Sequence, residues 1–150
     1  MSLVYPPTPE YAPMFAVLAR ETAWQVSGIE LDDTSKSLPL VERIVDRFRA
    51  QGKTHNDIPG TVFMFGCYVG EIFVREREAA WIEASKTPMR DHAGGVPILI
   101  ELGTDTFCNP IGKVAKRLDN GDVDSLVYFY EVFAPQAAPR RTSWLKKLWR

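Results

Sequence analysis

The stretch that decides the fold is Thr61-Val62-Phe63-Met64-Phe65-Gly66-Cys67-Tyr68-Val69-Gly70-Glu71-Ile72-Phe73-Val74-Arg75, which is apolar over almost its whole length. Its β-branched and aromatic residues favour a strand, but it is far longer than the usual strand of about five or six residues. That length favours a buried helix. Gly66 and Gly70, four residues apart, would let a neighbouring helix approach closely. We therefore expect a buried helix here.

Two amphipathic helices are expected before this stretch. The first begins at Pro9 or Tyr11 and ends near Ser27, before Gly28. Its apolar face consists of Tyr11, Met14, Phe15, Leu18 and Thr22. The second has Ser37 as its N-cap and ends at Gly52. Its apolar stripe consists of Leu40, Val41, Ile44, Val45 and Phe48, while Glu42, Arg43, Asp46, Arg47 and Arg49 are expected to face water.

A small sheet is expected after the buried helix. The segments Ala79 to Glu83 and Val96 to Leu102 resemble strands, and they can pair as an antiparallel hairpin. Pro97 then lies at a strand start or at an edge, because proline cannot donate to a sheet ladder.

Two further helices are expected after this hairpin. Asn109 caps the first of them, which Asn120-Gly121 terminates. Asp122 or Asp124 caps the second, which runs to Phe133. The order of elements predicts an α+β fold, with about five helices packed on a small antiparallel sheet.

Charge divides the chain into two parts. Residues 1–135 are expected to form a single globular domain with 13 basic and 19 acidic side chains, a net charge of −6. Residues 136–150 form a C-terminal tail with five basic side chains and no acid. A chain of this length buries enough surface for a stable core. The acidic domain argues against nucleic acid as a partner, because nucleic-acid binding normally needs a basic surface.

The cysteines and the apolar runs indicate a cytoplasmic protein. Cys67 and Cys108 lie in apolar stretches, as free thiols of a reducing compartment do. The first residues lack the charged start and apolar run of a signal peptide. No apolar run approaches the ~20 residues that span a bilayer.

Three residues of the central stretch form the candidate functional or structural centre: Tyr68, Glu71 and Arg75. Glu71 interrupts an apolar run, and buried carboxylates are rare unless they are paired. We favour a structural carboxylate, bonded to a backbone amide or to Arg75, which is four residues on and so lies on the same helical face. The alternative is a general acid or base with a raised pKa, in a pocket shared with Tyr68 and with Arg75 or Lys113.

Other polar residues indicate no catalytic, metal or cofactor site. His55 and His92 lie in loops beside Asp57 and Asp91 and are expected to be solvated. The aspartates around Asn120-Gly121 lack the register of a calcium loop and fit caps and turns. With two histidines in the chain, a Ser–His or Cys–His nucleophile has few possible partners. The sequence therefore predicts no cofactor.

The tail carries an interaction signal of its own. Its apolar side chains fall on one helical face and its basic side chains towards the other. The apolar set is Trp144, Leu145, Leu148 and Trp149, and the basic set is Lys146, Lys147 and Arg150. Such a segment docks on its own domain or on a second copy, fills a groove of a partner, or lies on a membrane surface.

The run Gly66-Cys67-Tyr68-Val69-Gly70-Glu71, followed by Trp81, resembles a Gly-x-Tyr-x-Gly-Glu … Trp pattern of small bacterial proteins of unassigned function. Leu31-Asp32 and Ser37-Leu38 resemble the segment that precedes the pattern in those proteins. Residues 109–121 resemble the segment that follows it. The resemblance implies a role as an immunity or toxin-neighbourhood factor, and it assigns no functional residues.

Together these features predict a small cytoplasmic protein-binding domain without catalytic activity, of immunity type. Its partner is expected to be another protein or a second copy of the chain. Two alternatives stay open. One is an enzyme of unfamiliar type centred on Glu71, and the other is a peripheral membrane or scaffold protein that uses the C-terminal tail.

Overall fold

The computed structural model describes residues 3–133, which form helices packed on a small sheet. The α-helices are α1 (Ala12–Ser27), α2 (Leu38–Ala50), α3 (Pro59–Arg77), α4 (Pro110–Asn120) and α5 (Leu126–Val132). The strands are β1 (Ala80–Glu83), β2 (Ile98–Glu101) and β3 (Phe107–Cys108), antiparallel in the order β1-β2-β3. Short 3₁₀ turns span Pro9–Tyr11, Ser35–Ser37, Ala84–Lys86, Arg90–His92 and Gly121–Val123. The predicted α+β fold is confirmed.

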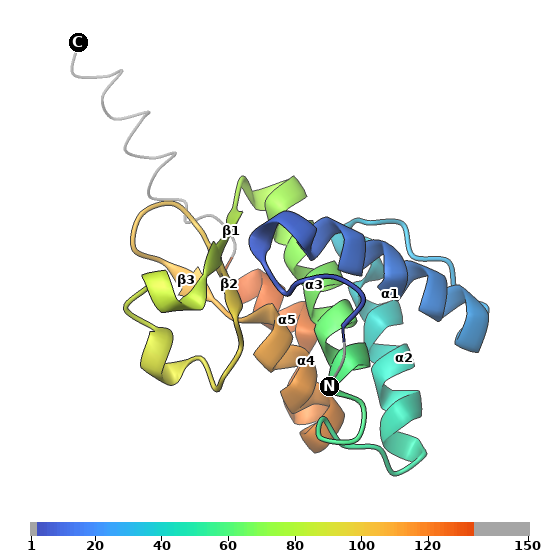
Figure 1. Cartoon of the computed structure of the whole chain (residues 1–150). Coiled ribbons are helices and arrows are strands. Elements are labelled where there is room, and N and C mark those ends of the chain that lie inside the picture. Colours follow the sequence, from blue (N-terminus) through green and yellow to red (C-terminus); the bar gives the residue numbers. More distant parts are fainter. Residues whose placement is uncertain (1–2, 134–150) are drawn as a thin grey trace.

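Helix α3 is the central element, as the length of the apolar stretch predicted. Figure 1 shows α3 running through the middle of the molecule, with α1 across it and α4 and the sheet packed beside it. Phe63 of α3 meets Phe15 of α1 edge-to-face, with ring centroids 4.8 Å apart. Because neighbours surround α3, its side chains are buried on more than one face and a strand-like composition still forms a helix.

Gly66 and Gly70 of α3 are points of very close packing. A Cβ atom added at Gly66 would lie 2.5 Å from the backbone Cα of Ile111 in α4. A Cβ added at Gly70 would lie 2.1 Å from the indole ring of Trp81 in β1. The expected close approach of a helix is therefore confirmed at Gly66, while Gly70 admits an aromatic side chain from the sheet.

The buried face of α1 differs from the predicted one. The helix ends at Ser27, and Gly28 adopts a left-handed conformation with φ of 61°, as expected. Its fully buried side chains are mostly alanines, namely Ala12, Phe15, Ala16, Ala19 and Ala23. Met14, predicted to lie in the core, is 44% exposed. Size explains the error, because small side chains allow α1 to lie close along α3 and leave larger ones outside.

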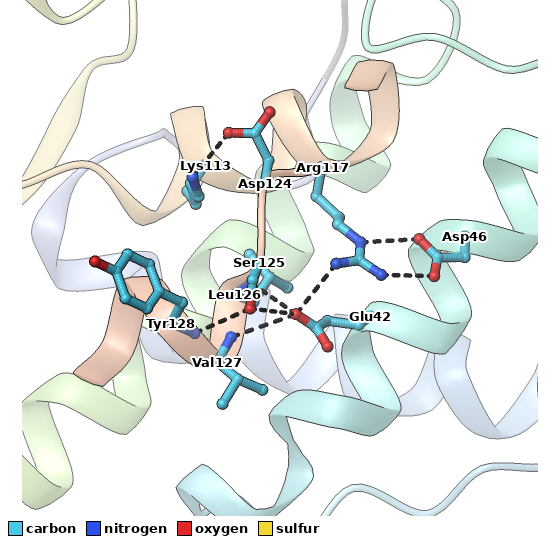
Figure 2. A network of polar contacts seen from close by, with 9 residues as sticks. All are labelled: Glu42, Asp46, Lys113, Arg117, Asp124, Ser125, Leu126, Val127 and Tyr128. Atoms are coloured by element: carbon cyan, nitrogen blue, oxygen red, sulfur yellow. Dashed lines mark hydrogen bonds and ion pairs between the residues drawn. The ribbon is translucent and has the colours of Figure 1, made fainter. Parts of the chain in front are cut away.

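Glu42 and Asp46 of α2, predicted to face water, form a polar network with α4 and α5 (Figure 2). The guanidinium group of Arg117 in α4 donates to both oxygens of Asp46, at 2.9 and 2.7 Å, and to Glu42 at 3.3 Å. The same Glu42 oxygen accepts the backbone N–H groups of Leu126 and Val127, at 2.7 and 3.3 Å. A carboxylate of α2 thus satisfies the first amides of α5, which favour negative charge.

The N-terminus of α5 is capped by Ser125 and not by either predicted aspartate. The Ser125 hydroxyl accepts the backbone N–H of Tyr128 at 3.0 Å. Asp124 instead accepts from Lys113 and from Asn120, each at 2.8 Å. Because Asp124 forms an ion pair with Lys113 of α4, its carboxylate does not cap α5.

Most of the other predicted boundaries lie close to the observed ones, although α2 ends at Ala50, before the predicted Gly52. Asn109 caps α4 by accepting the N–H of Gly112 at 2.8 Å, and α4 ends at Asn120 before Gly121. The hairpin of β1 and β2 is present, and Pro97 directly precedes β2. Strand β3 was not predicted, because two residues are too few for an alternating pattern. Ser37 stands at the N-terminus of α2, but its side chain makes no capping bond.

Both cysteines are buried and free, as predicted. Burial raises the pKa of each thiol, so both are held in the unreactive protonated form. Among residues 3–133, no helix combines the length and the apolar character that crossing a bilayer requires.

Candidate functional site

Two neighbouring hollows open beside α1. A hollow of about 160 Å³ lies between α1 and α3, lined by Val17, Arg20, Asp33, Tyr68, Glu71 and Arg75 among others. A second hollow, of about 510 Å³, lies between the last turns of α1 and the following loop, lined by Arg20, Glu21, Trp24, Gln25, Glu30 and Leu31. Arg20 belongs to both. We call the surface formed by these residues the α1 face.

Arg20, the residue common to both hollows, forms an ion pair. Arg20 of α1 donates to the carboxylate of Asp33 at 2.5 Å. Asp33 follows α1 in a loop and adopts φ of 67°, a left-handed conformation that non-glycine residues rarely take. Asp33 thus holds its carboxylate against Arg20 of α1, beside the smaller hollow.

Tyr68 holds the loop that contains Asp33 in place through hydrogen bonds. Its hydroxyl accepts the backbone N–H of Asp33 at 2.8 Å and lies 3.0 Å from the hydroxyl of Ser37. Ser37 donates its own proton to the carbonyl of Thr34 at 2.6 Å, so Tyr68 is the donor to Ser37. Tyr68 is 1% exposed, and its proton already has a partner inside the protein. Its contacts are those of a structural residue.

Glu71 is half-buried beside the smaller hollow. One of its oxygens accepts the indole N–H of Trp81 at 2.8 Å. The predicted structural carboxylate therefore has a side-chain partner from β1, in place of a backbone amide or a direct bond to Arg75. Burial raises the pKa of the Glu71 carboxyl, the hydrogen bond from Trp81 and the charge of Arg75 oppose the rise, and the charge of Asp33 adds to it.

The structure brings three of the four residues of the enzyme hypothesis together. Tyr68, Glu71 and Arg75 all line the smaller hollow. Lys113, the fourth, is paired with Asp124 at 2.8 Å and lines neither hollow. Its proposed place beside Glu71 is therefore wrong, because α4 directs this lysine towards the start of α5.

Replacing Glu71 with glutamine should change how stability depends on pH. The folded chain holds the Glu71 proton more tightly than the unfolded chain, because the folded-state pKa is raised above the ordinary 4.5. The carboxyl therefore contributes stability at low pH that is lost as the pH rises through the folded-state pKa. In urea titrations, we expect the free energy of unfolding of Glu71→Gln to rise relative to that of the wild type as the pH increases from 4 to 7.

Glu76, on the same helix, provides a control of opposite sign. Burial pushes its pKa up, but hydrogen bonds from Tyr130 and Ser35 outweigh burial, so that the pKa is lowered. This group contributes stability above its ordinary pKa and loses it as the pH falls. As the pH rises over the same range, the free energy of unfolding of Glu76→Gln should thus fall relative to that of the wild type, whereas that of Glu71→Gln should rise. A Glu71→Gln difference that is flat with pH would show that burial does not perturb this carboxyl.

The two histidines, expected in separate loops, line one hollow of about 330 Å³. His55 was predicted to be solvated beside Asp57, but its ring lies 2.5 Å from Asp119, an aspartate of α4. His92 is exposed, as expected. Among the residues that the structure describes, no three histidine, cysteine or acidic side chains are grouped so as to hold a metal ion.

Trp24 is the residue of the α1 face that sequence reasoning missed. It lies off the predicted apolar face of α1 and is 62% exposed at the wall of the larger hollow. Val17, seven residues earlier and so on the same side of the helix, is 37% exposed at the smaller hollow. An apolar pair outside the predicted stripe was the available signal.

The tail residues singled out in the sequence, Trp144, Leu145, Lys146, Lys147, Leu148 and Trp149, lie outside the described residues. The described part of the chain ends at Phe133, which packs against Phe129 with ring centroids 5.3 Å apart.

The polar residues of the α1 face can bind and orient a charged group, and its apolar residues can cover an apolar one. Tyr68, Arg20 and Asp33 are committed to contacts within the protein: Tyr68 accepts the N–H of Asp33, and Arg20 pairs with the Asp33 carboxylate. Comparisons of the chain with protein-family models, curated proteins and solved structures found no significant match.

Proposed function

We propose that this chain is a small cytoplasmic protein-binding domain of immunity type, which binds a basic protein through the α1 face. The observation that carries the proposal is Trp24, a tryptophan 62% exposed beside a hollow of about 510 Å³. Tryptophan is among the residues that supply most binding energy at protein interfaces. An exposed apolar group next to a concave surface is typical of such interfaces.

The charge of the α1 face favours a basic partner. Its two hollows are lined by four carboxylates, from Glu21, Glu30, Asp33 and Glu71, and by the two guanidinium groups of Arg20 and Arg75. The domain as a whole is acidic as well. Complementary charge raises association rates and selects the partner, while the apolar centre supplies affinity.

The cysteines and the sequence resemblance support the remaining parts of the proposal. Cys67 and Cys108 are free and buried, as in proteins of a reducing compartment. The Gly-x-Tyr-x-Gly-Glu … Trp pattern resembles that of small bacterial proteins of unassigned function, some of which are thought to be immunity or toxin-neighbourhood factors. In this chain the tyrosine and the tryptophan of the pattern position the loop and the carboxylate of the α1 face.

Replacing Trp24 with alanine should weaken partner binding at least about tenfold, the effect of removing an interface residue worth about 1.4 kcal/mol or more. The partner is sought by co-expression with the product of the adjacent gene and by pull-down from the native host. Its affinity for the wild type and for Trp24→Ala is then measured by calorimetry with both proteins purified.

Tyr128→Ala is the matched control, because Tyr128 is an aromatic residue of α5 with a similar exposure of 67%. This variant should keep the wild-type affinity. Equal affinity of Trp24→Ala and the wild type would remove the α1 face from the proposal. Failure to recover any protein partner by either route would contradict protein binding itself.

A second candidate, an enzyme centred on Glu71, has one observation in its favour. The half-buried carboxyl of Glu71 has a raised pKa and lines a hollow of about 160 Å³, as acid–base residues do. The committed proton of Tyr68 counts against it. A thermal-shift screen with small metabolites tests it: a compound that stabilises the wild type and not Glu71→Gln would favour the enzyme.

A further inference from the structure

We infer that the hollow of about 330 Å³ lined by His55 and His92 binds a small organic anion, a carboxylate or a phosphate monoester that carries an apolar group. The residues that line this hollow are separate from those of the α1 face. The inference therefore goes beyond the proposed function and does not depend on it. Its volume suits a small molecule, because ligand pockets commonly measure about 300 to 1,000 Å³.

Three parts of the chain that are far apart in the sequence form this histidine hollow. The loop before α3 and the first turns of α3 form one side, residues 92–97 form the second, and the first half of α4 forms the third. Helices α3 and α4 approach each other closely at Gly66, so their packing fixes two of the three sides.

Apolar side chains form most of the lining. Val62, Phe63 and Ile111 are among them, and all three are buried, so that their packing fixes the shape of the hollow. The polar side chains of the described lining are those of His55, His92 and Asn109. A mostly apolar lining with a few polar groups is the usual composition of a small-molecule site, and it favours a ligand with an apolar part.

The two imidazole rings are the polar side chains that a ligand can reach. Asn109 is occupied, because its oxygen accepts the N–H of Gly112 at 2.8 Å and its amide nitrogen donates to the carbonyl of Ala93 at 3.3 Å. Among the described residues, the hydrogen bonds of the histidine rings involve only Nδ1 of His55. Nε2 of His55 and the ring nitrogens of His92 can therefore bond to a ligand.

Asp119 fixes the orientation of the His55 ring. One of its oxygens lies 2.5 Å from Nδ1, and the other accepts the backbone N–H of His55 at 2.9 Å. A carboxylate bonded to Nδ1 keeps a proton on that nitrogen and stabilises the ring when Nε2 carries a second proton. The protonated Nε2 can then donate a charge-assisted hydrogen bond to an anionic oxygen of the ligand.

The charge of the lining favours an anion. Residues 1–135 contain 19 acidic side chains, yet none of the described residues that line the histidine hollow is acidic. The loop beside His92 adds backbone donors. Ala93 is right-handed, with φ of −83°, and Gly94 is left-handed, with φ of 64°. Successive N–H groups in this alternation form a concave site that attracts anions.

An NMR titration of the full-length protein tests the site. The chain has two histidines and both line the hollow, so the imidazole signals report on this place alone. The probes are phenyl phosphate, benzoate and the neutral benzyl alcohol, which share a ring and differ in charge. With at least one of the anions, we expect saturable shifts of both imidazoles and of the Val62 methyl groups. The Kd should be about 1 mM, as a probe of about ten non-hydrogen atoms allows.

The probes also distinguish the two kinds of anion. Saturation by phenyl phosphate alone would identify a phosphate site, and saturation by benzoate alone a carboxylate site. Benzyl alcohol should bind at least about tenfold more weakly than the better anion, because it cannot accept a charge-assisted hydrogen bond. Benzyl alcohol that binds as tightly as the anions would overturn the inference, and so would the absence of saturable shifts with both anions.

His92→Gln should raise the Kd of the better anion about tenfold, because one charge-assisted bond is lost. Its ring has no hydrogen-bond partner among residues 3–133, so this variant should unfold at the wild-type temperature. Arg90→Gln is the matched control. It removes a positive charge two residues from His92 that does not line the hollow, and it should keep the wild-type Kd. Equal losses of affinity in the two variants would show a general charge effect and overturn a site in the hollow.

Discussion

Arg117→Met is expected to lower the free energy of unfolding by about 3 kcal/mol, because it removes one partner of a buried ion pair. The Arg117 side chain is 7% exposed and bonds to both Glu42 and Asp46. Methionine keeps most of the apolar stem and removes the charge, so the loss reports the ion pairs and not the packing. Thermal unfolding should occur about 10 °C lower, given the size of the domain.

The cost arises mainly at Glu42. This carboxylate is 15% exposed, whereas Asp46 is 44% exposed and can be hydrated when Arg117 is gone. Glu42→Ala should therefore destabilise the domain more than Asp46→Ala, because it also strips the acceptor from the first amides of α5. Lys116→Ala, at the exposed neighbour of Arg117, should change stability by less than about 0.5 kcal/mol.

The network joins helices that are far apart in the sequence. Glu42 contacts residues 84 positions away in sequence, and Arg117 reaches residues 71 positions away. Figure 2 shows that the two side chains meet where α2, α4 and α5 converge. An Arg117→Met variant as stable as the wild type would show that burial of these charges costs as much as their pairing contributes.

Gly66→Ala is expected to lower the free energy of unfolding by about 2 kcal/mol. Alanine gains about 1 kcal/mol over glycine in a helix, but overfilling a close-packed core costs up to about 3 kcal/mol. The added Cβ would lie 2.5 Å from the Cα of Ile111, and backbone cannot rotate away as a side chain can. Helix α4 would have to move outward, which urea denaturation measures as a loss of stability.

Gly70→Ala is the comparison that isolates the cause. Here the added Cβ meets the ring of Trp81, at 2.1 Å, and no backbone. In a Trp81→Ala background, Gly70→Ala should become neutral or stabilising, because the ring is gone and the helix propensity of alanine remains. For Gly66→Ala, the matching change Ile111→Ala should leave most of the loss. Full relief in both pairs would contradict a backbone contact at Gly66.

These glycines also show why the sequence pattern has its form. Gly70 makes room for the ring whose N–H bonds to Glu71, and Tyr68 holds the loop that carries Asp33. The most distinctive run of the sequence therefore acts as the support of the α1 face. The exposed residues that carry the proposed function, Trp24 and Val17, lie outside that run.

Local rules were sufficient where a residue's neighbours along the chain decide its structure. The length of residues 61–75 predicted the central helix, Asn109 and Gly28 predicted helix ends, and two strand-like segments predicted the hairpin of β1 and β2. Caps, turns and apolar periodicity are properties of a few consecutive residues, so they can be predicted without knowing how the helices pack.

The side-chain partners depended on the tertiary structure. The sequence alone determined an α+β domain built on a buried helix, an acidic body and a basic tail. It placed Glu42 and Asp46 in water and left Trp24 unmentioned, since the partner of a charge and the exposure of an indole depend on which helix faces meet. Side-chain size decides which helix faces pack together, as the buried alanines of α1 show. Size has this effect only when segments distant in the sequence come into contact.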